Sequence, residues 1–342
     1  FEMIFVLTWQ LARLFGSVIV GSNAKKRLIP TEESFHFTER KIEALRLHRL
    51  LSHCCQHGSE EIIQKALKNV TFIPEAPTKR KALCIINPRS GNSDANNIME
   101  DLQPFIKASS DLIEFQLIQT THAFHAKEIA GEFNDEEFDV IVCVGGDGIP
   151  YEVVNGIMGR ENGKEILQRV AIAIIPAGTG NGITASLGIQ SPQDSMLRII
   201  HGNVKLFDVM LITQENNADL GTIYSLLQVS YGMMSDIDFE SEGIRFCGDL
   251  RFTMVAFFRL IFLRKYPVDI FFKAKARKDV VPPNKTVVWT ELEGEESNIH
   301  LDTKTVWCGG MNTSWLASDF NCAPSARIDD GLIHFLHLPF LG

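Results

Sequence analysis

Three continuous apolar runs, each stopped by a turn that contains glycine or proline, constrain the fold of this chain more than any other feature. The runs span residues 82–86, 138–144 and 170–175. Runs of this kind are typical of strands buried on both faces of a parallel sheet. Amphipathic stretches with helical spacing lie between them, at residues 122–133 and 152–159. Alternating strands and helices predict a layered α/β domain.

The pattern changes after Phe207, where short strand-like segments follow one another with few helices between them. They lie at residues 209–212, 224–231, 268–272, 286–290, 305–308 and 332–338. This pattern predicts a second, antiparallel domain of the β-sandwich kind. We therefore expect an α/β domain at 79–207 and a β-rich domain at 208–342. Residues 1–78 form an N-terminal extension of unclear fold, in which 37–51 and 60–70 have helical spacing.

Charge and cysteine content limit the class of protein. The 33 basic and 42 acidic residues give a net charge of −9, so we expect no nucleic-acid partner. Seven scattered cysteines without a C-x-x-C motif indicate a reduced, cytosolic protein. The apolar segments 3–20 and 252–263 contain Arg13 and Arg259, and neither reaches the roughly 18 uncharged residues of a membrane span.

Each of the three apolar runs leads into a glycine-containing loop, at residues 87–92, 145–148 and 176–181. Ligands of open α/β sheets bind at the carboxyl ends of the strands. Glycine lets the backbone approach a phosphate, and a following helix presents free N–H groups. One such loop fits an ordinary tight turn, whereas three together predict a phosphate-binding pocket. The P-loop and G-x-G-x-x-G motifs are absent, which weakens a dinucleotide site.

Asp147 is the acidic residue of the second loop, between Gly146 and Gly148. An aspartate between glycines fits a simple turn. In a phosphate cradle it would instead hold Mg²⁺ or accept the proton of an attacking hydroxyl. The sequence therefore indicates phosphoryl transfer.

The loops, together with the Glu-Val-Val-Asn-Gly stretch at 152–156, resemble the diacylglycerol kinase catalytic domain superfamily. The Gly-Gly-Asp-Gly element alone also fits NAD kinases and phosphofructokinases. The later stretch 236–242, Arg245 and residues 248–253 resemble sphingosine kinases, and the resemblance covers residues 81–338. It implies a Rossmann-like, phosphofructokinase-like α/β domain, followed by an antiparallel β-sandwich domain that carries a lipid-binding helical lid.

The same resemblance implies roles for individual residues. Asp147 would be the general base for the primary hydroxyl of sphingosine, and Asp238 would pair with its protonated amine. ATP-binding roles fall on residues of the loops, of nearby strand and helix ends and of the later motif: Asn87, Arg89, Gly91, Thr120, Gly145, Gly146, Gly148, Glu152, Gly178, Thr179, Gly180, Asn181, Arg245 and Arg251. The acyl chain would contact Met233, Phe252, Ala256 and Leu260. The metal ligands stay open.

The chain departs from the family pattern in two places. Pro150 and Tyr151 stand at the start of the helix after the second loop, where proline is tolerated. The family also has a later Val-Asp-Gly-Glu element that contacts ATP, and this sequence stops at Gly342 before it. Asp330 and Gly331 do not replace that element, so we expect a chain truncated at its C-terminus.

The sequence thus predicts a lipid kinase that uses ATP and Mg²⁺ to convert sphingosine to sphingosine 1-phosphate. We expect a cytoplasmic protein in peripheral contact with membranes through the apolar stretch 252–263, and the oligomeric state stays open. Alternatives are a diacylglycerol or ceramide kinase, a non-catalytic lipid-binding protein, and a soluble sugar-phosphate or NAD kinase. Without the resemblance, Asp238 fits a solvated loop edge, Arg245 and Arg251 fit surface charge, and 252–263 fits a buried core helix.

Overall fold

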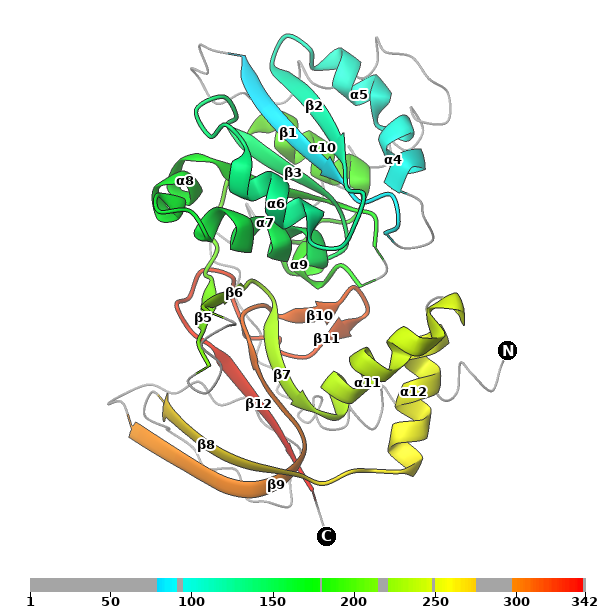
Figure 1. The fold of residues 1–342 in the computed structure, drawn as a ribbon, viewed down its shortest axis with the longest axis vertical. Helices are drawn as coiled ribbons and strands as arrows, with labels where there is room; N and C mark the ends of the chain where they lie inside the picture. Colours follow the sequence, from blue (N-terminus) through cyan, green and yellow to red (C-terminus); the bar gives the residue numbers. More distant parts are fainter. Residues whose placement is uncertain are drawn as a thin grey trace, which may run out of the picture.

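The computed structural model describes residues 79–90, 95–178, 180–214, 221–247, 250–274 and 297–340, without the side chains of 245–247, 273–274 and 297–299. The helices expected at 37–51 and 60–70 and the strand expected at 286–290 lie outside these residues. The described chain forms an α/β domain and a second domain with separate antiparallel sheets, as predicted (Figure 1).

A parallel four-stranded sheet is the centre of the α/β domain. Its order is β2-β1-β3-β4, with β1 at Arg80–Ile86, β2 at Ile113–Gln119, β3 at Val140–Gly145 and β4 at Ala171–Pro176. The three apolar runs are β1, β3 and β4. The sequence analysis missed β2, an edge strand whose polar residues are exposed.

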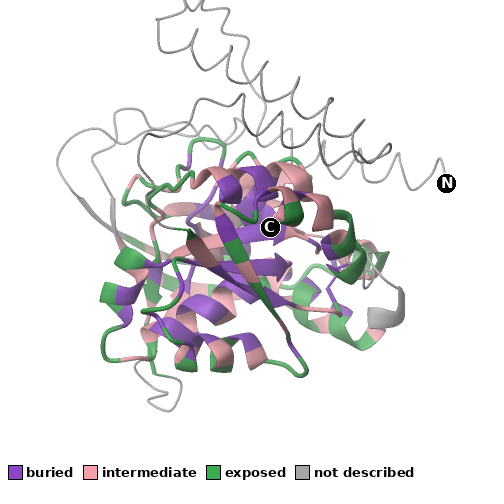
Figure 2. Ribbon diagram, turned by 90° about the horizontal axis from the view of Figure 1, so that it is seen from above, coloured by how far each residue is buried: buried purple, intermediate pink, exposed green. Residues whose placement is uncertain are grey.

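Alternate residues of the central strands enter two different apolar clusters, which explains why their sequences are apolar throughout. In β1, Ala82, Cys84 and Ile86 face one cluster, while Leu83 and Ile85 face the other. Figure 2 shows these buried strands between layers of helices. The first cluster contains side chains of α4 (Ala95–Asp101), α5 (Gln103–Ala108) and α10 (Pro192–His201). The second contains side chains of α6 (His125–Glu132), α7 (Gly148–Met158), α8 (Gly163–Arg169) and α9 (Gly182–Ser186).

The strand order reverses at β1, because β2 lies on one side of it and β3 on the other. A reversal of this kind opens a crevice outside the carboxyl ends of the two adjacent strands, where open α/β sheets bind ligands. In this chain those ends are Ile86 of β1 and Gly145 of β3. The first and second glycine loops therefore start at the crevice.

The second domain is built around one long strand, β9. Its sheet has the order β12-β9-β7, and β8 pairs with the first part of β9. All these pairs are antiparallel, as are the pairs β5-β6 and β10-β11. The strands are β5 (Met210–Ile212), β6 (Ile223–Ser225), β7 (Gln228–Gly232), β8 (Tyr266–Ala274), β9 (Ser297–Met311), β10 (Trp315–Ala317), β11 (Phe320–Asn321) and β12 (His334–Pro339). The single strand expected at 224–231 is thus two strands, β6 and β7.

Two helices and a 3₁₀ turn interrupt this domain between β7 and β8. They are α11 (Met233–Ser241), η2 (Glu242–Cys247) and α12 (Leu250–Ile261). In Figure 1, α11 and α12 lie together at one side of the sheet. Helix α12 is the apolar segment that also fitted a buried core helix, yet Met254, Phe258 and Ile261 are more than half exposed. Among the described residues, no helix has the length and apolar character needed to cross a membrane.

Candidate functional site

The first and second glycine loops pack against each other at the carboxyl ends of β1 and β3. The Asn87 backbone N–H donates to the Val144 carbonyl at 3.0 Å, and the Asn87 Oδ1 accepts from the Arg89 N–H at 3.0 Å. A Cβ at Gly145 would lie 2.8 Å from the Ser90 Oγ. A side chain at position 145 would therefore push these two loops apart, while Arg89 stays exposed.

The second and third loops meet through glycine backbone. A Cβ at Gly178 would lie only 2.6 Å from the Gly146 Cα, a distance that side chains do not tolerate. The backbones approach so closely because neither residue has a side chain there. All three loops therefore lie together at one end of the sheet.

Asp147, in the second loop, accepts hydrogen bonds from the residues that directly follow the third loop. Its Oδ2 accepts from the Gly182 N–H at 2.7 Å and its Oδ1 from the Ile183 N–H at 3.1 Å, both at the start of α9. Burial raises the pKa of this carboxyl above its ordinary 3.8, and the two backbone N–H donors act in the opposite direction. Each oxygen keeps a further lone pair, so the carboxylate can still accept a proton.

Asn181 gives the third loop an unusual backbone shape. It has a left-handed conformation with φ 45°, and its Nδ2 donates to the Gly178 carbonyl. Its Oδ1 is buried and has no hydrogen-bond partner among the described residues. The loop therefore presents an unsatisfied acceptor beside the glycine contact, and buried acceptors normally have a partner.

Three residues of the Glu-Val-Val-Asn-Gly stretch make contacts that hold α7 against α6 and β6. Glu152 accepts from the Ala126 N–H at 3.2 Å, at the start of α6. Asn155 donates to the Tyr224 carbonyl at 2.7 Å and accepts from the Tyr224 N–H at 2.9 Å, which joins α7 to β6. A Cβ at Gly156 would lie 2.2 Å from the Lys127 carbonyl oxygen, so only glycine lets α6 and α7 pack this closely.

Strand β10 of the second domain contacts the third loop and α9. The Ser318 N–H donates to the Gly180 carbonyl at 2.5 Å, and the Trp315 N–H donates to the Ser186 Oγ at 3.0 Å. A Cβ at Gly182 would lie 2.5 Å from the Leu316 carbonyl oxygen. The sequence analysis missed Gly182, although a glycine directly after the Gly-Thr-Gly-Asn loop was the available signal.

The other residues predicted to bind ATP lie in different surroundings. Thr120 is buried at the end of β2, and its N–H donates to the Ile86 carbonyl at 2.8 Å. Gly148 starts α7, and a Cβ there would meet open space. Gly91, Thr179 and the side chain of Arg245 lie outside the described part of the chain.

The predicted lipid contacts come together between α11, α12 and the sheet. Met233 is buried with Ile237 and Val306, and Phe252, Ala256 and Leu260 pack against this group. Asp238 is exposed on α11. On α12, Arg251 donates to Glu242 at 2.9 Å, and its guanidinium carbon lies 4.4 Å from the centre of the Phe252 ring.

The structure thus forms two groups of predicted residues, one in each domain. No hydrogen bond or ion pair between described residues joins Asp238 or Arg251 to the glycine loops. That the two groups act on one substrate stays a prediction.

A buried arginine that sequence reasoning passed over joins the two helices of the second group. Arg259 of α12 is 4% exposed, forms an ion pair with Glu240 and lies 3.6 Å from the Asp236 Oδ2. Arg264 and the Tyr266 hydroxyl also bond to Asp236, at 2.9 Å and 2.5 Å. The arginine in an otherwise apolar segment was the signal, because a buried charge needs a partner.

Comparison with known proteins identifies the class. The diacylglycerol kinase catalytic domain family matches residues 81–212. A crystal structure of a diacylglycerol kinase from Bacillus anthracis superposes with a TM-score of 0.51 and 19% identity, over 78% of this chain and 77% of that one. This likeness shows the fold alone.

The sequence relatives narrow the class to one family. Sphingosine kinase 1 of Rattus norvegicus is 30% identical over 77% of this chain and 73% of its own length. Sphingosine kinase 1 of Arabidopsis thaliana is 32% identical over 75% of this chain, and the match spans 56% of the plant protein. The chain belongs to the sphingosine kinase family, and it spans little more than half the length of its plant relatives.

Proposed function

We propose that this protein transfers the γ-phosphoryl group of ATP to the primary hydroxyl of a sphingoid base, giving sphingosine 1-phosphate. Membership of the sphingosine kinase family supports a lipid kinase and the use of ATP. The observation that carries the proposal is the position of Asp147, whose carboxylate joins the second loop to the start of α9, beside the third loop.

The glycine loops fit a nucleotide phosphate. The Gly146–Gly178 contact leaves backbone at the surface where side chains would otherwise stand. The loops lie at the strand-order reversal, the usual position for such a ligand. The unpartnered Oδ1 of Asn181 offers an acceptor to a ribose hydroxyl or to water on a metal ion.

ATP, when bound with Mg²⁺, supplies the phosphoryl group. Asp147 takes the proton of the lipid hydroxyl, and burial makes its carboxylate a stronger base than a free aspartate. Among the described residues of the three loops it is the one acidic side chain. Arg245 and Arg251 neutralise phosphate charge in this proposal, and Arg251 must leave Glu242 to do so.

The cluster around Met233 and Ile237 is the proposed site of the lipid chain. It combines Phe252, Ala256 and Leu260 with Asp238 on the neighbouring helix surface. A carboxylate favours a lipid with a protonated amine, which diacylglycerol and ceramide lack. Burial of the alkyl chain stabilises the complex by about 0.8 kcal/mol per CH₂.

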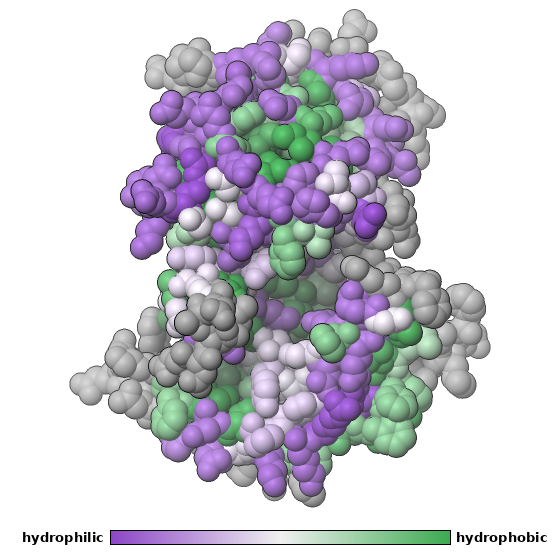
Figure 3. Space-filling model, viewed as in Figure 1, coloured by the Kyte–Doolittle hydropathy of each residue, from purple (hydrophilic) through white to green (hydrophobic). Residues whose placement is uncertain are grey.

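We also propose that α12 contacts the membrane that holds the lipid. Leu250, Met254, Phe258, Ile261 and Phe262 are more than half exposed and follow helical spacing. Figure 3 shows apolar side chains gathered over this helix. Co-sedimentation with vesicles, and its loss in Phe258→Asp, tests this contact.

A lipid panel tests the proposed reaction. The chain is incubated with labelled ATP and Mg²⁺ and with sphingosine, ceramide or diacylglycerol, beside an Asp147→Asn control. We expect labelled phospholipid from sphingosine alone, and none from the variant. Label in diacylglycerol or ceramide alone would reject the sphingoid substrate. A folded chain that labels no lipid would favour the non-catalytic alternative.

A further inference from the structure

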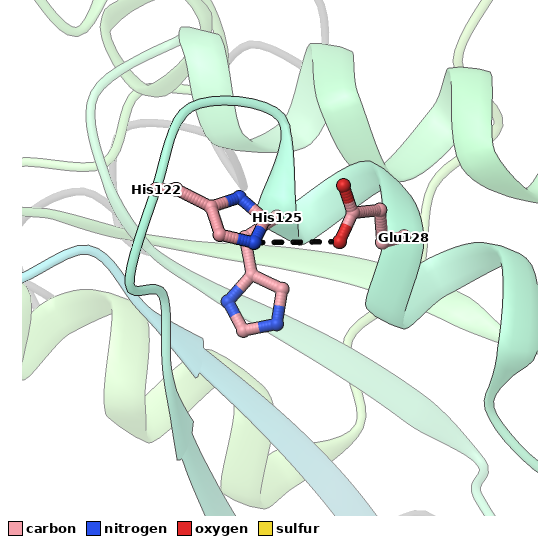
Figure 4. A group of neighbouring side chains, drawn as sticks. All are labelled: His122, His125 and Glu128. Atoms are coloured by element: carbon pink, nitrogen blue, oxygen red, sulfur yellow. Dashed lines mark ion pairs between the residues drawn. The ribbon is translucent and has the colours of Figure 1, made fainter.

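Three potential metal ligands lie together at the loop between β2 and α6. His122 belongs to the loop, His125 is the first residue of α6, and Glu128 lies one turn further on. One ligand atom from each lies within 4.8 Å of the other two. Figure 4 shows the His122 ring turned toward the Glu128 carboxylate, with the His125 ring beside it. Within the residues that the structure describes, no other three histidine, cysteine or acidic residues are grouped in this way.

His122 and Glu128 already have the separation of two ligands. The His122 Nε2 and the Glu128 Oε2 are 3.5 Å apart. The His122 Nδ1 lies 3.1 Å from the Ala123 carbonyl oxygen, which only accepts, so Nδ1 carries the ring proton. In the neutral ring, Nε2 then presents a lone pair to a carboxylate oxygen. Two acceptors that face each other require a proton or a cation between them.

His125 can complete the set. Its ring centre lies 4.5 Å from that of His122, with 40° between the ring planes. Its Nδ1 accepts from the Thr121 backbone N–H at 3.1 Å and lies 3.3 Å from the Thr121 Oγ1. Coordination through Nε2 therefore requires the ring proton to move to Nδ1, where the Thr121 Oγ1 replaces the backbone N–H as its partner. Metal-bound histidines are usually held by such an acceptor on the second nitrogen.

The backbone between the two histidines is bent at an unfavourable residue. Phe124 has φ 63°, is exposed, and makes no side-chain cap to α6. A left-handed conformation at a bulky residue is uncommon, and such strain is found at ligand clamps. The bend returns His122 over the first turn of α6, where it meets Glu128.

We propose that His122, His125 and Glu128 form a binding site for Zn²⁺. Two imidazole nitrogens and one carboxylate oxygen are a ligand set of zinc sites that keep one position for water. Tetrahedral bonds of about 2.0–2.2 Å hold ligand atoms roughly 3.3–3.6 Å apart. His122 and Glu128 match this spacing, and rotation of the His125 side chain would bring its Nε2 inward. The metal would clamp the loop that follows Thr120 to the start of α6.

Metal titration of the purified, tag-free chain tests this proposal without nucleotide or lipid. Co²⁺ serves as the spectroscopic probe, and Zn²⁺ is followed by calorimetry. The variants are His122→Ala and Glu128→Gln, with Glu132→Gln as the matched control one turn further along α6, where the side chain is also exposed. Circular dichroism verifies that each variant is folded.

We expect one equivalent of Zn²⁺, displacement of Co²⁺ with a tetrahedral spectrum, and affinity at least about tenfold weaker in His122→Ala and Glu128→Gln. Glu132→Gln keeps the affinity of the parent chain. Histidine ring signals in NMR spectra of the unmodified chain should shift on addition of Zn²⁺, which tests the ligands without any variant. Absence of stoichiometric binding would show that an imidazolium–carboxylate ion pair fills the gap instead. Binding that is equal in all variants would place the metal elsewhere, for example on cysteines. Both results overturn the site and leave the proposed kinase activity untouched.

Discussion

The glycine loops of the α/β domain and the α11–α12 pair of the second domain are held together in different ways. The loops meet backbone to backbone, at Gly146 and Gly178, and a single carboxylate joins two of them. The helices meet through an apolar cluster and through side-chain charges, with Arg259 between Asp236 and Glu240. A site made of backbone has one geometry, whereas a site made of long side chains can adapt. This difference fits the proposal of a fixed phosphate site in the loops and of a lipid site between the helices that admits a long chain.

Asp147→Asn should have the largest effect, and it acts on the loop region alone. We expect the rate of lipid phosphorylation to fall about 10²–10⁴-fold, the usual contribution of a general base. The amide accepts from only one of the Gly182 and Ile183 N–H groups, so we also expect a small loss of stability. Initial rates and urea unfolding measure both effects. A folded variant with parental activity would remove Asp147 from the reaction.

Gly156→Ala tests how much the close packing of backbone contributes. The new Cβ would lie 2.2 Å from the Lys127 carbonyl oxygen, so α6 and α7 must separate. We expect a loss of about 1–3 kcal/mol in the free energy of unfolding.

Gly131→Ala is the matched control on the partner helix. Its Cβ would meet the Gly156 carbonyl oxygen at 3.8 Å, an ordinary contact. Alanine is the better helix former, so this variant should gain about 0.5–1 kcal/mol. Equal losses in the two variants would mean that the interface does not depend on this contact.

Arg259→Met tests the charge-based contact between α11 and α12. The substitution keeps an apolar stem and leaves Glu240 without its main partner. We expect a loss of about 1–2 kcal/mol, less than for a fully buried pair, because Arg264 still lies near Asp236 and Glu240.

Arg264→Met, at an exposed arginine of the same network, should cost less than about 1 kcal/mol. Hydrogen exchange of the α12 amides measures both effects locally. Protection that is lost equally in the two variants would contradict a special role for the buried arginine.

The pH dependence is the smallest expected effect. It separates the contribution of Asp147 to stability from its proposed role as the base. Its folded-state pKa is raised above 3.8. The group therefore contributes stability below pH 3.8 that is lost as the pH rises through the raised pKa. Activity should increase over the same range, because the ionised form is the base.

Stability and initial rate, measured against pH for the parent chain, should therefore move in opposite directions as Asp147 ionises. The unfolding curve of Asp147→Asn should lack this component. An acid limb of activity at or below pH 3.8 would contradict the role of burial.

The sequence predicted the parts of this molecule that are encoded locally. The strands β1, β3 and β4 and their glycine loops each lie within a few residues, so periodicity and turn chemistry were sufficient. The family resemblance, which the comparisons confirm, came from the same loops and from the stretch around Asp238.

Contacts between distant residues could not be predicted in this way. Asn155 bonds to Tyr224, and Gly182 packs against Leu316, across separations that leave no periodic signal. Helix α12 is apolar on nearly every side in sequence, so its exposed face was not distinguishable from its packed face. Only the position of α11 and the sheet decides which residues of α12 are buried.

The division between a phosphate site and a lipid site is tested most directly by steady-state KM values for both substrates. The measurement compares the parent chain with Asp238→Asn, in the helix region, and with Gly178→Ala, in the loop region. We predict that Asp238→Asn raises the KM for sphingosine and leaves the KM for ATP unchanged, and that Gly178→Ala does the reverse. An Asp238→Asn variant that raises the KM for ATP, or one that leaves the KM for sphingosine at the parental value, would contradict this account.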